Sequence, residues 1–245
     1  MTVLGRYGGC PGPDGACRGF WLQGRAGTLL VGCGSGVAAR LHWAPATGVP
    51  DAVVLPDLRP DHASDLWALG SQAAADAAAG RRRGLLHVYA YGAPAEAWRR
   101  LHRPGVLDVR RFDGGDIVEA AGWRLLFART GHPWPSLAVR AEAGGSAVGF
   151  TGLGDAGADG RRLLRGVDLL LADVGGAVWG DEDETLQGGM TPAEAGALAA
   201  DVGAGRLLLT HIDPGLDLRA AEGAAMAGHP RAQMAVEGRT YEFSP

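Results

Sequence analysis

Carboxylate, imidazole and guanidinium side chains are concentrated in one short segment of the chain. Positions 57–62 read Asp-Leu-Arg-Pro-Asp-His and follow the apolar run Ala52–Leu55 almost directly. This pattern predicts a buried strand that enters a tight loop and then a helix beginning near His62. A loop at the end of a strand aims several side chains at one point, and imidazole and carboxylate groups gathered there bind divalent metals. The segment is therefore the first candidate for chemistry.

The segment resembles the strand–loop–helix of the metallo-β-lactamase superfamily, whose signature is H-x-H-x-D-H. Other stretches resemble further motifs of that family and occur in the expected order: Gly32-Cys33-Gly34-Ser35-Gly36, Arg129-Thr130-Gly131-His132-Pro133, Ala172-Asp173-Val174, Gly189-Met190-Thr191-Pro192-Ala193-Glu194-Ala195-Gly196 and Leu208-Leu209-Thr210-His211. The resemblance is strongest to small bacterial hydrolases related to ribonuclease Z. It covers essentially the whole chain and implies a single domain over residues 1–245, an α/β fold of four layers (αββα) with two facing mixed sheets and helices outside.

The resemblance implies two metal positions. The first would be held by positions 57 and 59 with His132, and the second by Asp61, His62 and His211. A bridging aspartate is expected near position 153. Two such metals lower the pKa of a bridging water to about 7 and polarise a carbonyl or phosphoryl group of the substrate.

The sequence departs from the signature mainly at the first metal position. Asp57 and Arg59 stand where the signature has histidines, and Leu153 stands where the bridging aspartate is expected. Glycine also replaces the aspartate expected at position 32 and the histidine expected at position 189. The first position therefore keeps only His132 of its expected ligands.

Arg59 is the decisive substitution. A guanidinium stays protonated and is not a metal ligand. Two cations in such proximity repel each other by several kcal/mol at an effective dielectric constant of about 20. We therefore expect that no two-metal site forms, and that Arg59, with Asp57 as its partner, binds a carboxylate, phosphate or enolate of the substrate.

The second metal position keeps Asp61, His62 and His211, a three-ligand set with an open fourth position that is typical of catalytic zinc. Asp155 or Asp173 would supply a further oxygen. At most one Zn²⁺ is expected, and a site without metal is the open alternative. In that alternative Asp61 would only cap the helix that begins at His62.

Three functions remain open. The first is an enzyme of specialised biosynthesis in which His132, His211, Asp57 and Arg59 perform acid/base catalysis on a small molecule without a metal. The second is a mono-zinc hydrolase of an ester, lactone, thioester or phosphoester. The third is a pseudoenzyme that binds a ligand or a partner without catalysis. Metal content separates the second from the other two.

Composition limits the partners. The formal net charge of -4 gives no electrostatic footprint for nucleic acid. All 23 basic residues are arginines, so no lysine is present for a Schiff base. The three cysteines, Cys10, Cys17 and Cys33, are an odd number without zinc-ribbon spacing, which argues against a disulfide framework. We expect a cytoplasmic protein with a small-molecule substrate and no nucleic-acid or membrane partner; a homodimer is expected by resemblance alone.

Short apolar runs, glycine-rich turns and helical stretches supply the elements that must position the site. Strands are predicted at Thr2–Leu4, Gly19–Leu22, Thr28–Val31, Ala52–Leu55, Leu85–Tyr91, Val106–Phe112, Asp116–Ala120, Trp123–Thr130, Leu137–Ala143, Ala147–Thr151, Leu169–Val174 and Leu207–Thr210. Helices are predicted at Val37–Trp43, His62–Ala79, Pro94–Arg103, Thr191–Val202 and Leu216–Met226. The helix at Thr191 begins with a capping box that Glu194 completes. Strand meanders followed by alternating helices and strands, twice over, predict two sheets that face each other.

A few other residues carry open alternatives. Cys33 would be either a nucleophile or, as we favour, a small buried residue of the glycine-rich turn. The core is expected to contain Trp21, Trp43, Trp67 and Trp123. Trp134 and Trp179 would line a pocket or pack within loops, and Asp181–Glu184 is expected to be a solvated loop near the site. Four histidines match no family ligand and are expected on the surface or in packing: His42, His87, His102 and His229.

Overall fold

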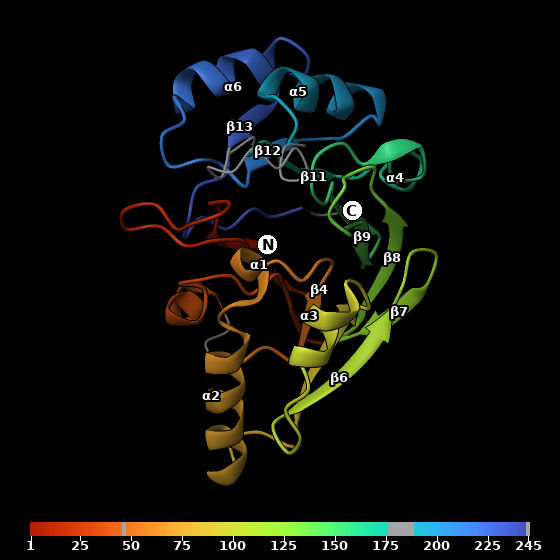
Figure 1. Ribbon diagram of the computed structural model, residues 1–245. Coiled ribbons are helices and arrows are strands. Elements are labelled where there is room, and N and C mark those ends of the chain that lie inside the picture. The colour runs from red at the N-terminus through yellow and green to blue at the C-terminus, as the bar shows by residue number, and fades with distance from the viewer. Residues whose placement is uncertain (46–47, 176–188, 244–245) are drawn as a thin grey trace.

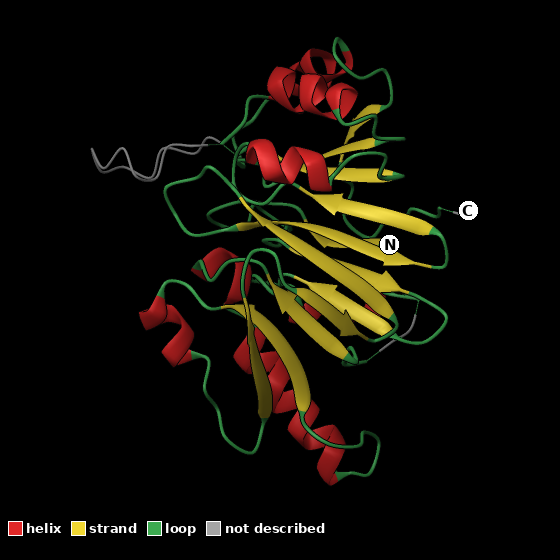
Figure 2. Cartoon of the chain, turned by 90° about the vertical axis from the view of Figure 1, so that its right-hand side faces the viewer, coloured by secondary structure: helices red, strands yellow, loops and turns green. Residues whose placement is uncertain are grey.

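The strands of the computed structural model, which describes residues 1–45, 48–175 and 189–243, form two sheets that face each other (Figure 2). The first sheet contains, in spatial order, β1 (Thr2–Gly5), β2 (Gly19–Gln23), β3 (Thr28–Val31), β4 (Ala52–Leu55), β5 (Leu86–Tyr91) and β6 (Leu107–Phe112). The second contains β13 (Ala232–Met234), β12 (Leu207–Thr210), β11 (Leu169–Asp173), β10 (Ser146–Phe150), β9 (Leu137–Ala143), β8 (Trp123–Arg129) and β7 (Ile117–Ala120).

Each sheet combines an antiparallel meander with parallel strands. The run β1-β2-β3 is antiparallel and β3-β4-β5-β6 is parallel. In the second sheet β7-β8-β9-β10 is antiparallel and β10-β11-β12-β13 is parallel. The parallel strands β4, β11 and β12 are buried along their whole length, as expected for strands covered on both faces. Because neighbouring parallel strands run the same way, the segments that follow them leave the sheet at one edge.

Helices cover the outer faces of both sheets, which confirms the predicted four-layer fold (Figures 1 and 2). On the first sheet these are the 3-10 helix η1 (Ala38–Trp43) and the α-helices α1 (Pro60–Ala63), α2 (Leu66–Ala78) and α3 (Ala95–Arg100). On the second sheet they are α4 (Gly157–Leu163), α5 (Pro192–Asp201) and α6 (Leu218–Met226). No helix among the described residues is long and apolar enough to cross a membrane.

The main core lies between the sheets. Phe20 of β2 and Phe150 of β10 meet there with ring centroids 5.6 Å apart, and Phe112 and Phe127 stack at 4.0 Å. Two further apolar clusters fill the spaces between each sheet and its helices. This packing makes the strand ends that carry polar residues rigid supports for a site.

The predicted helix His62–Ala79 is wrong in one respect, because it is divided into α1 and α2. The backbone N–H of Asp65 donates to the carbonyl of Cys33, and the Asp65 carboxylate accepts from the N–H of Ala38. These long-range bonds replace helical bonds at the junction. The capping box at α5 is confirmed: Thr191 accepts from the N–H of Glu194, and the Glu194 carboxylate accepts from the N–H of Thr191.

Two of the four tryptophans predicted to be buried lie partly at the surface. Trp21 and Trp123 are buried, whereas Trp43 is 37% exposed and Trp67 is 38% exposed. The ring of Trp43 lies under the guanidinium of Arg40, 4.6 Å from the ring centroid, which explains how a large apolar side chain is accommodated there. Trp179 and Asp181–Glu184 lie outside the described residues.

Candidate metal and substrate site

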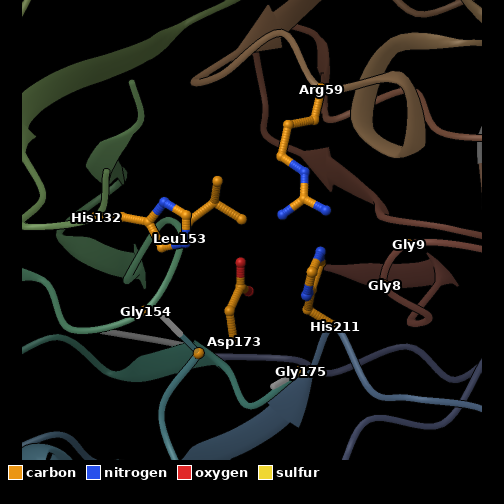
Figure 3. Close-up of a pocket in the computed structure, with 10 residues that line it drawn as sticks. Gly8, Gly9, Arg59, His132, Leu153, Gly154, Asp173, Gly175 and His211 are labelled. Carbon is orange, nitrogen blue, oxygen red and sulfur yellow. The ribbon is translucent and has the colours of Figure 1, made fainter. Parts of the chain in front are cut away.

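Side chains from four strand ends surround a small cleft at the edge of the sheets (Figure 3). Arg59 comes from the loop after β4, and His132 from the loop after β8. Asp173 is the last residue of β11, and His211 follows β12 directly. Arg59 enters the cleft from one side, while Asp173 and His211 point towards it from the other. The structure thus brings together residues that are up to 152 positions apart (59 to 211) in the chain.

Asp61, His62 and His211 form a buried cluster beside this cleft. One ligand atom of each lies within 4.8 Å of those of the other two. The Oδ2 atom of Asp61 lies 3.0 Å from Nε2 of His211 and 3.4 Å from Nε2 of His62. A carboxylate and two imidazoles that converge at this spacing can hold a divalent metal.

Asp57 holds the far side of the His62 ring. Nδ1–H of His62 donates to the carboxylate of Asp57, 2.6 Å from Oδ2, and the same carboxylate accepts from the backbone N–H of Arg59 at 3.1 Å. Burial opposes ionisation of Asp57, but the positive charges of His62 and Arg18 prevail and lower the pKa of its carboxyl. Burial likewise opposes charge on His62, but Asp57 and Asp61 raise the pKa of its imidazole. Asp57 therefore partners His62, which corrects the expectation that it would partner Arg59.

Asp61 is placed by contacts from three separate segments. Its Oδ2 atom accepts from the N–H of Gly9 at 2.8 Å, and its Oδ1 atom lies 3.3 Å from Nε of Arg59. Burial would raise the pKa of this carboxyl, but His62, His211 and Arg59 together lower it. Arg59, not Asp61, is the N-cap of α1, so the alternative that Asp61 only caps the helix is wrong.

His211 fits its position only because glycines stand next to it. A Cβ atom on Gly8 would lie 2.4 Å from Nδ1 of His211, and one on Gly175 would lie 2.0 Å from the His211 carbonyl oxygen. His211 itself has a φ of 55°, a left-handed conformation that is uncommon for residues other than glycine. Strain of this kind persists only where the surrounding structure enforces it, and it is common at functional sites.

His132 has a geometry that does not suit a metal. Its Nδ1 atom accepts from the N–H of Trp134 at 2.9 Å, so the neutral ring carries its proton on Nε2. Burial, with a contribution from Arg59, lowers the pKa of this imidazole and favours the neutral ring. A metal needs an unprotonated ring nitrogen. With Arg59 and Leu153 also lining the cleft, the first metal position does not fit a metal, whereas Asp61, His62 and His211 fit one.

Arg18 is the site residue that the sequence pattern missed. It precedes β2, is buried, and pairs with Asp173, with Nη1 2.6 Å from Oδ2. One arginine at the start of a strand gives no local signal of such a role.

Asp173, expected as an additional oxygen ligand, lines the cleft, whereas Asp155 is exposed and pairs with Arg161 at 3.1 Å. Trp134 is not among the residues that line the cleft.

A model of the beta-lactamase superfamily domain matches residues 28–212, and the chain therefore belongs to the metallo-β-lactamase superfamily. A relative in Bacillus subtilis, the "Probable metallo-hydrolase YhfI", is 31% identical over 217 residues, which are 86% of each chain. The crystal structure of that metallo-β-lactamase fold protein superimposes with a TM-score of 0.84 at 27% identity and covers 98% of both chains.

Two other solved structures have the same fold at lower identity. A diphosphatase from the PhnP family has a TM-score of 0.77 at 17% identity and covers 99% of this chain and 97% of its own. The short form of human tRNase Z has a TM-score of 0.71 at 16% identity, with 97% of this chain and 96% of its own covered. These likenesses show the shared fold, with ribonuclease Z-like proteins among its structural neighbours.

Proposed function

We propose that the protein is a hydrolase of a small anionic molecule that holds one divalent metal at Asp61, His62 and His211 and uses Arg59 where the first metal of the superfamily signature would otherwise lie. One observation carries this proposal. The Nε2 atom of His62 is buried and has no hydrogen-bond partner among the described residues, while Asp57 fixes the opposite nitrogen. Buried polar atoms in native proteins almost always have a partner. A metal at this cluster would be that partner.

The contact between His62 and Asp57 supports a ligand role for His62. Metal-binding histidines commonly donate their second ring N–H to a carboxylate, which fixes the ring and makes the ligating nitrogen more basic. Asp57 provides such a carboxylate at 2.6 Å. When bound, a metal would act as a Lewis acid and lower the pKa of a water molecule for hydrolysis.

Arg59 supports an anionic substrate. Its Nε atom is held by Asp61, and its terminal nitrogens extend into the cleft (Figure 3). The side chain remains 15% exposed, so a ligand can reach it. A guanidinium binds carboxylate or phosphate through two parallel hydrogen bonds. An ester, lactone, thioester or phosphoester that carries such a group is therefore the substrate class that we favour. His132 lines the same cleft, and its Nε2–H would donate a hydrogen bond to the developing negative charge on the oxygen of the leaving group.

A second candidate is acid/base catalysis without a metal by His132, His211, Asp57 and Arg59. The observation in its favour is that Arg59, His132 and His211 line one cleft, where imidazoles can exchange protons with a substrate. In that case turnover would survive removal of all metal. A protein that binds small anions but shows no turnover with or without metal would instead be a pseudoenzyme.

The test is the metal content of protein purified without chelator, measured by inductively coupled plasma mass spectrometry and by zinc titration. We expect about one equivalent in the wild type, as in mononuclear catalytic sites. His62→Gln should lose it. His132→Gln, on the opposite side of the cleft, is the matched control and should keep it. A wild-type protein that takes up no zinc, or a His132 variant that loses it, would refute the single-metal proposal.

A further inference from the structure

Arg18 lies beneath the cleft as a buried cation that the proposed chemistry does not use. The residue is 1% exposed, and among the described residues only the Nη1 atom of its guanidinium has a hydrogen-bond partner, Oδ2 of Asp173. The Nε and Nη2 atoms of Arg18 and the Oδ1 atom of Asp173 have no hydrogen-bond partner among the described residues. Burying a charge costs free energy unless nearby opposite charges and hydrogen bonds compensate it. The position of Arg18 therefore needs an electrostatic explanation.

Gly32 provides the space for this side chain. A Cβ atom on Gly32 would lie 3.2 Å from Cγ of Arg18 and 3.0 Å from its carbonyl oxygen. Gly32 also has a φ of 75°, a conformation that side-chain-bearing residues rarely adopt. The superfamily motif that this turn resembles has aspartate at this position. The absence of a side chain at position 32 therefore leaves the space that the methylene groups of Arg18 occupy.

Arg18 belongs to a row of charges that alternate in sign. The order is Asp173, Arg18, Asp57, His62, Asp61 and Arg59, and these residues come from three separate segments of the chain, around positions 18, 57–62 and 173. The contacts along this row are 2.6 Å (Arg18 to Asp173), 2.6 Å (His62 to Asp57), 3.4 Å (His62 to Asp61) and 3.3 Å (Arg59 to Asp61). Between Arg18 and Asp57 the structure has no hydrogen bond among the described residues, so these two opposite charges interact only through space.

The balance of these charges limits the number of metals. With His62 neutral, as metal binding requires, three carboxylates and two guanidiniums give 2 - 3 = -1. One divalent metal at Asp61, His62 and His211 makes the row +1, which suits an anionic ligand. A second divalent metal would make it +3 in a largely buried space, where like charges repel strongly.

We infer that Arg18, together with Arg59, replaces the charge of the first metal: it is a permanent internal cation that keeps Asp57 and Asp173 compensated and leaves room for one divalent ion. Arg59 is partly exposed at the rim and can turn towards a ligand. Arg18 is enclosed and fixed, so its charge is part of the site with or without ligand. This inference rests on the proposed single-metal function, but it concerns a different residue and has its own test.

The test is a series of charge variants in the full chain: Arg18→Met, Asp173→Asn, the double variant, and Arg18→Lys as the matched control. Zinc affinity is measured by competition with a chromogenic chelator. If Arg18 acts as a cation, its removal should tighten zinc binding at least about tenfold, and Asp173→Asn should weaken it at least about tenfold, as expected for one unit charge that acts on a divalent ion within about a nanometre. The double variant and Arg18→Lys should bind within about threefold of the wild type, because their net charge is unchanged.

A purely structural role predicts the opposite sign for Arg18→Met. If this variant binds zinc more weakly than the wild type, or if Arg18→Lys behaves like Arg18→Met, the inference is wrong. A wild type that binds no zinc, together with an Arg18→Met variant that does, would refute the single-metal proposal and support the role of Arg18.

Thermal unfolding decides the remaining case, in which no variant binds zinc. Arg18→Met leaves buried carboxylates without their cation and should lower the unfolding midpoint by roughly 6–20 °C. Adding Asp173→Asn should restore at least half of that loss, because it removes one uncompensated charge. A double variant that is less stable than Arg18→Met would overturn the inference.

Discussion

Nδ1 of His62 lies 2.6 Å from Oδ2 of Asp57, and both side chains are completely enclosed beneath the cleft. In the superfamily signature, position 57 carries a histidine that binds the first metal. Here a carboxylate at that position orients His62, a ligand of the single metal that we propose. In this proposal, the substitution removes a ligand of the first metal and strengthens the placement of a ligand of the second.

This relationship predicts that Asp57→Asn weakens metal binding without touching a ligand. An amide is neutral and a weaker acceptor, so it polarises the imidazole less and holds the ring less firmly. We expect zinc affinity to fall by about 10–100-fold, the usual effect of losing such a carboxylate. Chelator competition measures the change. Asp108→Asn, at an exposed His87–Asp108 pair on β5 and β6, is the control and should leave affinity unchanged.

Arg59 should determine the binding of anions at the cleft. Inorganic phosphate is a suitable probe, and its dissociation constant can be followed by ³¹P nuclear magnetic resonance. Arg59→Gln removes the charge and should weaken phosphate binding at least about tenfold, while Arg59→Lys, which cannot form two parallel bonds, should lie in between. Arg129→Gln, whose guanidinium pairs with Asp113 on an exposed surface, should bind phosphate normally. Equal binding by Arg59→Gln and the wild type would exclude this role.

The strands that carry the site were predictable because each is a short apolar run that leads directly into polar residues. The strands β4, β11 and β12 read as short buried segments followed by polar residues, and the structure places them as expected. The break between α1 and α2 was not predictable, since it depends on Asp65 bonding to Cys33, 32 positions earlier (65 - 33). Helix α4 contains glycines at both 157 and 160, so its local propensity is poor and packing must stabilise it.

Within the site, the sequence indicated individual residues better than their pairing. Asp61, His62 and His211 could be proposed as a set because the resemblance supplies their order. The partner of Asp57 could not, because both Arg59 and His62 are near it in the chain. The Arg18–Asp173 pair joins residues 155 positions apart, and neither has a neighbouring motif that points to the other. Long-range ion pairs of this kind follow from the folded topology and not from local pattern.

Gly8 should be essential for the position of His211. In Gly8→Ala the new methyl group would lie 2.4 Å from Nδ1 of the imidazole, so the ring or the Gly8–Gly9 backbone must move. Movement of either disturbs Asp61, which bonds to both His211 and Gly9. We expect loss of zinc binding and destabilisation by about 1–3 kcal/mol, as for overpacking elsewhere.

The control for this variant is Gly223→Ala on α6, where an added Cβ meets no atom within 4 Å. Alanine favours a helix over glycine by up to about 1 kcal/mol, so this change should be neutral or stabilising and should leave zinc binding intact. Chemical denaturation and zinc titration of both variants measure the difference. If Gly8→Ala binds zinc as well as Gly223→Ala does, the close packing of His211 is not required for the site.

The cysteines provide a final prediction, which tests whether Cys33 is a nucleophile. Burial raises the pKa of the Cys17 thiol to about 12, and burial also raises the pKa of Cys33, with a contribution from Asp65. The reactive form of cysteine is the thiolate. At pH 8 the folded protein should therefore leave Cys17 and Cys33 unmodified by iodoacetamide, with labelling confined to the half-buried Cys10. After denaturation in guanidinium chloride all three thiols should react, which intact-protein mass spectrometry will show. Rapid alkylation of Cys33 in the folded state, slowed by phosphate bound in the cleft, would instead identify it as a nucleophile of the site.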